Sequence, residues 1–330
     1  MNRLIHYCSV EAIPFYNCSW KSSEEWWDTG VQRPWLGIPI LILGLFYELL
    51  YAPVIYIIFK TRLIRYPCYK IIVMLAITDM IAITCSCLIT GVLVIQGAVF
   101  CSYPTFIYIE GGFGIGTWCI SCAITVALFL NRIVSIVFKG QADVIEKRFA
   151  YSSMLICVCY FFYVCFCSAP PVYNSKIMAW IPDPLSEEVT SAEASAWYQS
   201  SSQTWNNWIF VSCMLTLFTI YNTLVKRLAK GHTSKASRAI FIQCCFICFF
   251  NTVIAIIYNA LALITLAPWI LVFCQLCWSI NHGVPVFIYV TLNETIRREF
   301  KRLICGRRNP RIDEKLSSLA NVHSITTSRI

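Results

Sequence analysis

The sequence is poor in charge for its length. Only 13% of its 330 residues are charged, whereas 58% are hydrophobic. Soluble globular proteins carry about 25% charged residues. The first thirty residues also lack the apolar core of a signal peptide. The composition therefore excludes a soluble globule and predicts a membrane protein whose first apolar stretch acts as its own insertion signal.

Histidine and intramembrane lysine are scarce as well. The chain has four histidines, of which only His282 falls in a predicted span, and no lysine occurs in residues 269–292. Histidine-box desaturases need many histidines, and retinal-linked photoreceptors need a lysine in that span. No paired acids of an intramembrane aspartyl protease stand out. We therefore expect neither an enzyme nor a photoreceptor.

Cysteine is abundant, but its placement excludes a disulfide framework. Most of the 19 cysteines lie inside apolar stretches, and the pairs at residues 119/122, 245/248 and 274/277 have the spacing of metal or redox motifs. A helical pair in lipid lacks the polar second shell that a metal centre needs. We interpret these cysteines as small packing residues and expect no metal centre built on them.

Seven apolar stretches are each long enough to cross a bilayer, which takes roughly 20 helical residues. They are residues 37–59, 71–95, 104–137, 149–168, 208–225, 240–266 and 269–292. The sequence predicts an all-α membrane protein, a seven-transmembrane helix bundle over residues 37–292. Residues 1–36 would precede the bundle as a separate segment.

Positive charge is nearly missing from one side of this predicted bundle. Of 26 lysines and arginines, only Arg3, Lys21, Arg33 and Lys176 lie in the N-terminal segment or the even-numbered loops. The positive-inside rule places the N-terminus outside and the C-terminus in the cytoplasm. The net charge of +9 is therefore juxtamembrane, where it faces anionic lipid and cytoplasmic partners rather than nucleic acid.

Only three cysteines should meet the oxidising exterior: Cys8, Cys18 and Cys101. We expect one disulfide among them, from Cys101 to either Cys18 or Cys8, and the sequence leaves the partner open. Asn17 begins an Asn-Cys-Ser glycosylation acceptor on the same predicted face. It is a candidate glycosylation site that agrees with the topology.

Polar residues recur at helical spacing within the spans and predict the inner face of each helix. The third span has Glu110, Gly114, Thr117, Ser121, Thr125 and Arg132, the fifth Ser212, Thr216, Thr219 and Thr223, the sixth Gln243, Asn251 and Tyr258, and the seventh Gln275, Trp278, His282, Pro285 and Tyr289. We expect these stripes to converge on a central polar crevice. For the Ser and Thr positions we favour interhelical hydrogen bonding that only holds the bundle together. For Asp79 and Glu110 we favour a functional role, because a buried carboxylate is costly. Glu48 would either line the outer crevice or bond to the seventh helix.

The segment after the seventh span predicts a surface helix. In residues 293–305, Ile296, Phe300, Leu303 and Ile304 alternate with basic residues at helical spacing. This pattern is typical of an amphipathic helix on the inner leaflet. Cys305 at its end is a palmitoylation candidate. Residues 306–330 are polar and are expected to be a disordered cytoplasmic tail.

Several short motifs together resemble the nematode serpentine-receptor chemoreceptors, most closely class T, within the rhodopsin-like seven-helix receptors. They are Cys68-Tyr69-Lys70, Thr90-Gly91, Trp118-Cys119, Leu130-Asn131-Arg132 and Asn281-His282-Gly283-Val284-Pro285. The resemblance covers residues 37–305. It implies a G-protein-coupled chemosensory receptor of the plasma membrane, such as that of a sensory cilium. Its implied partners are a small extracellular ligand, a heterotrimeric G protein and the bilayer, and a receptor dimer stays open.

The resemblance also implies roles for single residues. Asp79 matches the second-helix acid that holds a sodium ion in rhodopsin-like receptors, and Ser121 has the spacing of a sodium-site hydroxyl. Arg132, with Tyr221, Asn281, Pro285 and Tyr289, would rearrange during activation and coupling. The ligand would bind among Glu110, Thr117, Tyr258, Trp278 and His282.

Departures from the receptor pattern put some of these roles in doubt. Pro285 and Tyr289 are one residue too far apart for the usual motif, and the second outer loop has no cysteine. Asn131 stands where an acid would restrain Arg132. The alternative function is a transporter or ligand-gated ion channel, since buried acids can mark ion paths.

Overall fold

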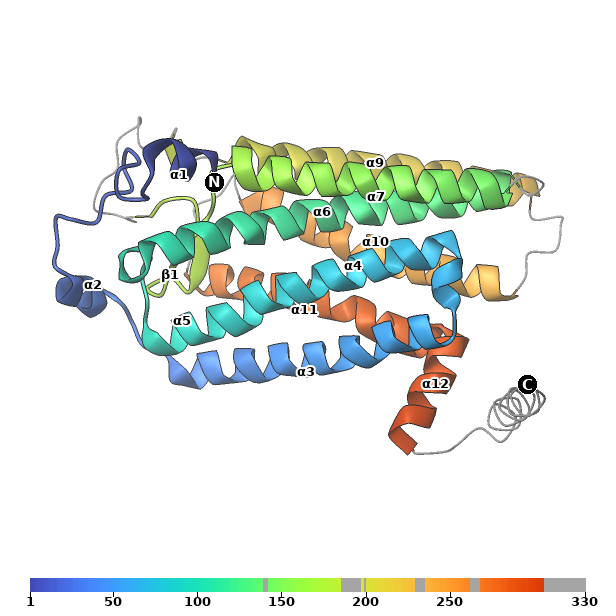
Figure 1. The fold of residues 1–330 in the computed structure, drawn as a ribbon, viewed down its shortest axis with the longest axis horizontal. Helices are drawn as coiled ribbons and strands as arrows, with labels where there is room; N and C mark the ends of the chain where they lie inside the picture. The colour runs from blue at the N-terminus through green and yellow to red at the C-terminus, as the bar shows by residue number, and fades with distance from the viewer. Residues whose placement is uncertain (139–141, 185–196, 199, 229–234, 262–267, 306–330) are drawn as a thin grey trace, which may run out of the picture.

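The computed structural model describes residues 1–138, 142–184, 197–198, 200–228, 235–261 and 268–305. Side chains at several further positions, Tyr258 and Cys305 among them, are outside this description, as is the tail 306–330. Long helices run alongside one another and form a bundle (Figure 1).

The bundle is built from the following helices. They are α3 (Pro34–Lys60), α4 (Pro67–Ile83) continued by the π-helical turn η2 (Thr84–Ile89) and α5 (Thr90–Gln96), α6 (Pro104–Val137), α7 (Ala142–Cys167), α9 (Ser201–Leu228), α10 (Lys235–Leu261) and α11 (Pro268–Leu292). Proline occupies the first position of α3, α4, α6 and α11, where its missing N–H would have no intrahelical partner anyway. Helix α6 packs against α4, α7, α9 and α10 and is the central element.

Short elements gather at one end of the bundle, which we call the cap end (Figure 1). They are α1 (Asn2–Tyr7), α2 (Ser23–Thr29), η3 (Phe100–Ser102) and a hairpin of β1 (Val172–Asn174) and β2 (Ala179–Ile181). The hairpin is antiparallel, with Tyr173 opposite Trp180. The opposite end holds η1 (Leu63–Arg65) and α12 (Glu294–Cys305).

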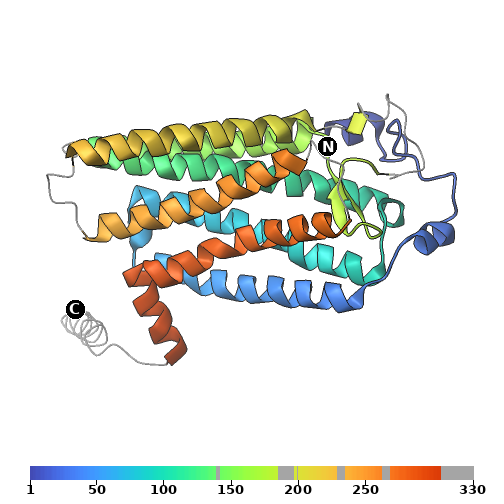
Figure 2. The ribbon, with the colours of Figure 1, turned by 180° about the vertical axis from the view of Figure 1, so that it is seen from behind.

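Helix α12 turns away from α11 at a steep angle (Figure 2). The side chain of Asn293 sets this turn, because its Oδ1 accepts a hydrogen bond from Ile296 N at 3.1 Å and its Nδ2 donates to Tyr69 Oη at 2.8 Å. Ile296 is fully buried, whereas Ile304 is exposed. The asparagine therefore caps α12 and ties it to α4.

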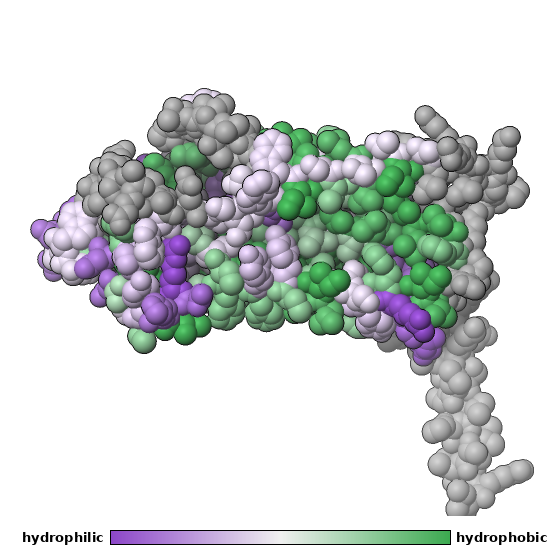
Figure 3. Space-filling view, turned by 90° about the horizontal axis from the view of Figure 1, so that it is seen from above, coloured by the Kyte–Doolittle hydropathy of each residue, from purple (hydrophilic) through white to green (hydrophobic). Residues whose placement is uncertain are grey.

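Five helical segments in the described residues are long and apolar enough to cross a membrane. They are Pro34–Lys60, Pro67–Gln96, Pro104–Ser135, Val144–Cys167 and Trp269–Leu292, and α10 adds the shorter apolar stretch Cys244–Ile257. Apolar side chains cover the middle of the bundle, and polar ones gather toward the cap end (Figure 3). The exposed apolar surface of α3 and α7, with Leu49, Leu155 and Ile156 prominent, is suited to lipid and not to water.

The expectation that the fifth polar stripe faces the crevice is wrong. Ser212, Thr216, Thr219 and Thr223 on α9 are all exposed. Each threonine hydroxyl donates to the carbonyl four residues earlier, at 2.8–2.9 Å. A hydroxyl that is satisfied within its own helix can face lipid at little cost, which is why helical spacing alone misplaced this face.

Candidate functional site

A fully buried polar cluster joins three helices in the middle of the bundle. His282 Nδ1 of α11 lies 2.8 Å from Asp79 Oδ1 of α4, and Tyr51 Oη of α3 lies 3.0 Å from Asp79 Oδ2. The same tyrosine oxygen lies 2.7 Å from the His282 carbonyl oxygen. Asp79 and His282 are 1% and 0% exposed. The cluster therefore links α3, α4 and α11 by side chains that water does not reach.

Two tryptophans pack around the imidazole of this cluster. The rings of Trp118 on α6 and Trp278 on α11 each lie 6.3 Å from His282, edge to face. Trp118 Nε1 donates to Asn207 Oδ1 on α9 at 2.8 Å. Among the described residues, His282 Nε2 and Trp278 Nε1 have no hydrogen-bond partner. The aromatic ring pair extends the cluster from α11 to α6 and α9.

The donor set around Asp79 does not fit a resident sodium ion. Both of its carboxylate oxygens are already engaged, by Tyr51 and by His282. Hard cations need several free oxygen ligands. The hydroxyl of Thr125 donates to the backbone carbonyl of Ser121, and the described residues contain no cluster of His, Cys, Asp or Glu that could hold a metal ion. The carboxylate to which the resemblance assigns a sodium ion, Asp79, is instead bonded to an imidazole nitrogen of His282.

The π-helical turn η2 connects this cluster toward the cap end. A π turn shifts the backbone register and leaves carbonyls free for other donors. The Ser86 carbonyl accepts from Gln275 Nε2 and Ser279 Oγ of α11, both at 3.3 Å. Thr90 Oγ1 donates to the Cys85 carbonyl at 2.8 Å and accepts from Trp180 Nε1 of the hairpin at 2.9 Å. Hydrogen bonds thus run from the hairpin through η2 to α11.

Glu110 on α6 and Trp278 on α11 are two further buried polar residues. Each is 9% exposed. Gly114, one turn beyond Glu110, leaves room for the Trp278 ring, because a Cβ there would lie 3.5 Å from Cη2 of the indole. Glu110 Oε1 has no hydrogen-bond partner among the described residues. One carboxylate oxygen of Glu110 and the indole N–H of Trp278 are therefore both without partners among the described residues, and Gly114 lies between them on the α6 side.

The other residues predicted to bind a ligand do not all point to the same place. Thr117 donates to the Gly114 carbonyl at 2.9 Å and lines a groove between α4, α6 and α7. His282 belongs to the Asp79 cluster. The side chain of Tyr258 lies outside the described residues. Glu48, for which the sequence left two positions open, accepts a hydrogen bond from Thr84 Oγ1 of η2 at 3.3 Å, and the described residues show no bond from it to the seventh helix.

At the end opposite the cap, Arg132 is 8% exposed and forms an ion pair that its sequence neighbours did not predict. Its Nη2 lies 2.7 Å from Glu146 Oε1 on α7 and also donates to Asn131 Oδ1. Asn131 replaces the expected acid, and Glu146 supplies the charge from fourteen residues further along the chain. No local sequence motif indicates Glu146 as the partner of Arg132, because Arg132 is on α6 and Glu146 is on the next helix, α7.

The remaining residues expected to act in coupling lie on α9 and α11. Asn281 Nδ2 donates to Asn251 Oδ1 at 2.9 Å, and Asn251 Nδ2 donates to Thr125 Oγ1 at 3.3 Å, so amides link α11, α10 and α6. The Tyr221 ring lies 5.9 Å from Phe129. The hydroxyl of the buried Tyr289 has no partner in the described part of the chain. Pro285 lies inside α11.

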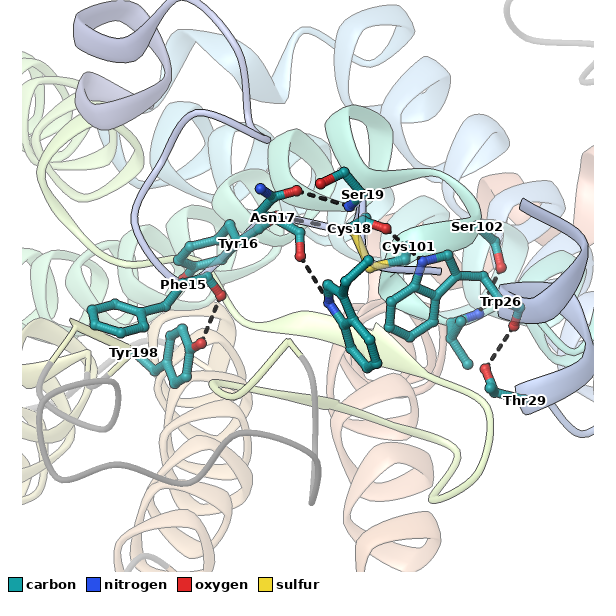
Figure 4. The surroundings of a disulfide bond; sticks show 12 residues. Phe15, Tyr16, Asn17, Cys18, Ser19, Trp26, Thr29, Cys101, Ser102 and Tyr198 are labelled. Atoms are coloured by element: carbon teal, nitrogen blue, oxygen red, sulfur yellow. Dashed lines mark hydrogen bonds between the residues drawn. A yellow bond between two sulfur atoms is a disulfide. The ribbon is translucent and has the colours of Figure 1, made fainter. Parts of the chain in front are cut away.

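A disulfide joins the N-terminal segment to the start of α6. Cys18 and Cys101 are bonded, with their Cα atoms 5.6 Å apart and 83 positions between them in sequence, while Cys8 is an exposed free thiol. Trp26 donates its indole N–H to the Cys18 carbonyl at 2.8 Å. Figure 4 shows this cluster lying across the ends of the helices. The bond holds the N-terminal segment over the cap end.

Hydrogen bonds between side chains and backbone complete the cap. Ser175 lies in the hairpin loop. Its Oγ accepts a hydrogen bond from Val31 N at 3.1 Å and donates one to the Gly97 carbonyl at 2.9 Å. Gly97 has a φ of +71°, in the left-handed region that favours glycine. Arg33 donates to the Ser175 carbonyl. The N-terminal segment, the α5–α6 connection and the hairpin are thereby joined into one unit.

Tyrosines inside the cap are held protonated. Burial raises the pKa of Tyr198 to about 12, and its hydroxyl donates to the Phe15 carbonyl at 2.6 Å. Burial also raises the pKa of Tyr16 and of Tyr173 above their ordinary value. On the cap surface, hydrogen bonds from Ser22 lower the pKa of Glu25, which closes the N-terminus of α2 in a capping box.

A bundle of membrane-length apolar helices around a buried polar cluster defines a helical multi-pass membrane protein. Residues 3–313 match the family model described as "Serpentine type 7TM GPCR chemoreceptor Srt". The chain is 24% identical over 302 residues to "Serpentine receptor class T-55" of Caenorhabditis elegans, covering 88% of this chain and 80% of that protein.

The chain therefore belongs to the Srt family of seven-transmembrane chemoreceptors. It is a multi-pass membrane protein, and the predictions of fold class and family are confirmed. This family is one of receptors and not of enzymes.

Proposed function

We propose that this receptor binds a small extracellular organic molecule between α6 and α11 and activates a heterotrimeric G protein. The observation that carries the ligand site is the unpartnered pair formed by Glu110 Oε1 and Trp278 Nε1. Buried polar atoms without partners are costly. A ligand with one hydrogen-bond donor and one acceptor would satisfy both atoms and pack against the indole. Tyr258 and His282 are the further candidates for this site, whereas Thr117 lines the groove between α4, α6 and α7.

In this proposal the cap end faces outside and the α12 end faces the cytoplasm. The basic residues of the loops and of α12, including Lys60, Arg65, Lys147 and Arg297, support this orientation through the positive-inside rule. The plasma membrane, with a sensory cilium as the specialised case, is the proposed location. Such an orientation gives the ligand access from the outside and the G protein access from the inside.

Ligand binding would reach the coupling end through the buried contacts. The hairpin, η2 and α11 are joined by hydrogen bonds, and α11 is joined to α4 through His282 and Asp79. Binding would favour a second arrangement of the helices in which Arg132 leaves Glu146. Tyr221, Asn281, Pro285 and Tyr289 would rearrange with it and admit a helix of the G-protein α-subunit.

The ligand site is tested by expressing the full receptor in cells with a second-messenger reporter and screening a panel of volatile and soluble metabolites. For an active compound, Glu110→Gln and Trp278→Phe should each lower potency about tenfold or more, since a hydrogen bond to a charged group contributes about 1.5–3 kcal/mol. Glu48→Gln is the matched control, because Glu48 is a half-buried acid outside the proposed site.

Surface expression is measured in parallel. Unchanged potency in both site variants would contradict the binding site. Current or substrate flux that persists in cells lacking G-protein α-subunits would contradict the receptor mechanism and support transport.

A further inference from the structure

A membrane-facing groove lies between α4 and α7, with α6 as its floor. It has a volume of about 640 Å³. Figure 1 shows α4 and α7 flanking α6, and all three helices pack against one another. Ile77 and Ile81 form one wall, Leu155 and Val158 the other, and Ile120 the floor. Leu155 is 66% exposed, so the groove opens sideways, toward lipid.

The walls of the groove offer no free hydrogen-bonding group along most of their length. Thr78 Oγ1 donates to the Met74 carbonyl at 2.9 Å, and Thr117 Oγ1 donates to the Gly114 carbonyl at 2.9 Å. The other residues that line the middle of the groove are apolar. A polar solute would lose its hydrogen bonds to water there without replacement. The groove therefore suits a hydrocarbon chain.

The end of the groove near η1 is basic. Lys70 and Tyr151 line it, and the Lys70 ammonium contacts the Tyr151 hydroxyl and lies 4.3 Å from the centre of its ring. Lys147 is exposed one turn before Tyr151 on α7. In the described part of the chain, no carboxylate pairs with Lys70. The ammonium is therefore available to an anion from outside the protein.

The length of the groove matches one leaflet. From Lys70 to Ile81 the helix rises roughly 16 Å, and half of the hydrocarbon core is about 15 Å thick. An acyl chain that begins at the basic end would extend along the apolar walls to the middle of the bilayer. A basic end followed by one leaflet of apolar wall is the complement of an anionic phospholipid.

We propose that this groove is a binding site for an anionic phospholipid of the cytoplasmic leaflet, with its phosphate on Lys70 and Tyr151 and one acyl chain against Ile77 and Leu155. The assignment to the cytoplasmic leaflet rests on the orientation proposed above. The preference for negatively charged headgroups rests on Lys70 and does not depend on that orientation. The site is separate from the Glu110–Trp278 pair. A bound lipid would hold α4 and α7 at a fixed separation, next to the Arg132–Glu146 ion pair that α7 contributes to.

The experiment uses the full receptor in nanodiscs of phosphatidylcholine with and without phosphatidylserine. Native mass spectrometry after release into detergent counts retained lipids, and spin-labelled phosphatidylserine reports contact with the protein. We expect retention of phosphatidylserine over phosphatidylcholine. Lys70→Gln should weaken it about fivefold, the effect of about 1 kcal/mol per basic residue near an anionic lipid.

Two matched pairs of variants separate this site from general effects. Lys60→Gln removes a cation at the same end of the bundle that rests on Tyr56 and not in the groove, and it should leave retention unchanged. Leu155→Trp should fill the groove and lower retention of both lipids, whereas Leu49→Trp, at an exposed position on α3, should not.

Three outcomes would overturn the proposal. Equal retention of the two phospholipids, or retention of phosphatidylserine unaffected by Lys70→Gln, would show that headgroup charge is not recognised. Displacement of both phospholipids by an added sterol, with no dependence on headgroup charge, would assign the groove to the sterol instead. Failure of metabolite signalling would not affect any of these measurements.

Discussion

The pairing of His282 with Asp79 is the residue-scale feature with the clearest chemical consequence. Each oxygen of the buried carboxylate has a protein partner, Tyr51 or His282. The protein itself therefore supplies the groups that stabilise the buried carboxylate, the Tyr51 hydroxyl and the His282 imidazole. A solvent cation then has to compete with Tyr51 and His282 for the Asp79 carboxylate.

We therefore expect the thermal stability of the purified receptor to be the same in sodium chloride and in choline chloride. His282→Ala should lower stability by about 1–3 kcal/mol, because a buried carboxylate loses a partner. It should also produce sodium-specific stabilisation, since Asp79 Oδ1 and a cavity become available. His6→Ala on the exposed face of α1 is the control. Sodium stabilisation of the unmodified receptor, measured by a thermal shift, would contradict this assignment.

The Arg132–Glu146 ion pair gives a second residue-scale prediction. If the pair restrains the inactive arrangement, Glu146→Gln should raise ligand-independent second-messenger signalling several-fold, and Arg132→Ala should abolish coupling at normal surface expression. Lys147→Gln, at the exposed neighbouring position, should change neither. Full signalling by Arg132→Ala would refute its role in coupling.

Single residues also show where reasoning from sequence ends. Asp79, Arg132 and His282 attract attention because charged and titratable side chains are rare in apolar spans. Their partners Tyr51 and Glu146 carry no such signal, since an aromatic residue in a span and an acid near a loop are both ordinary. Which side chains meet depends on how distant helices rotate against one another, and helical spacing does not specify that rotation.

At the scale of elements, hydropathy predicts helices well and predicts their interruptions poorly. The seven-helix fold class follows from apolar length and loop charge, and it is confirmed. The π-helical turn η2 leaves no trace in hydropathy, because inserting one residue into a turn does not change its composition. The hairpin Val172–Ile181 is held by contacts with Thr90, Gly97 and Arg33, which lie far away in sequence.

The disulfide of the cap gives the element-scale prediction. The sequence left Cys8 and Cys18 as alternatives, and the structure bonds Cys18 to Cys101. Cys18→Ser and Cys101→Ser should each lower stability by about 2–4 kcal/mol, since the bond closes a long loop, and both should reduce delivery to the cell surface. Cys8→Ser should not. Non-reducing peptide mapping and surface labelling measure these effects, and loss of stability only in Cys8→Ser would contradict the pairing.

At the scale of the whole molecule, the orientation in the membrane is open to a direct test. Asn17 is exposed on the cap, and its Oδ1 accepts from Ser19 N at 2.8 Å. If the cap end is outside, Asn17→Gln should remove a glycan and increase electrophoretic mobility, whereas Asn2→Gln should not. An antibody to a C-terminal tag should bind only after permeabilisation. Binding to intact cells would reverse the orientation and remove the basis for G-protein coupling at the α12 end.

The position of the cap disulfide along the chain also constrains biogenesis. Cys18 precedes α3 and Cys101 follows α5, so the two thiols flank the first pair of membrane-crossing helices. They reach the same compartment only once both of these helices have been threaded through the bilayer. The bond can therefore form only in chains whose first two membrane-crossing helices have inserted correctly. A cell that retains unoxidised chains would degrade those in which this insertion failed.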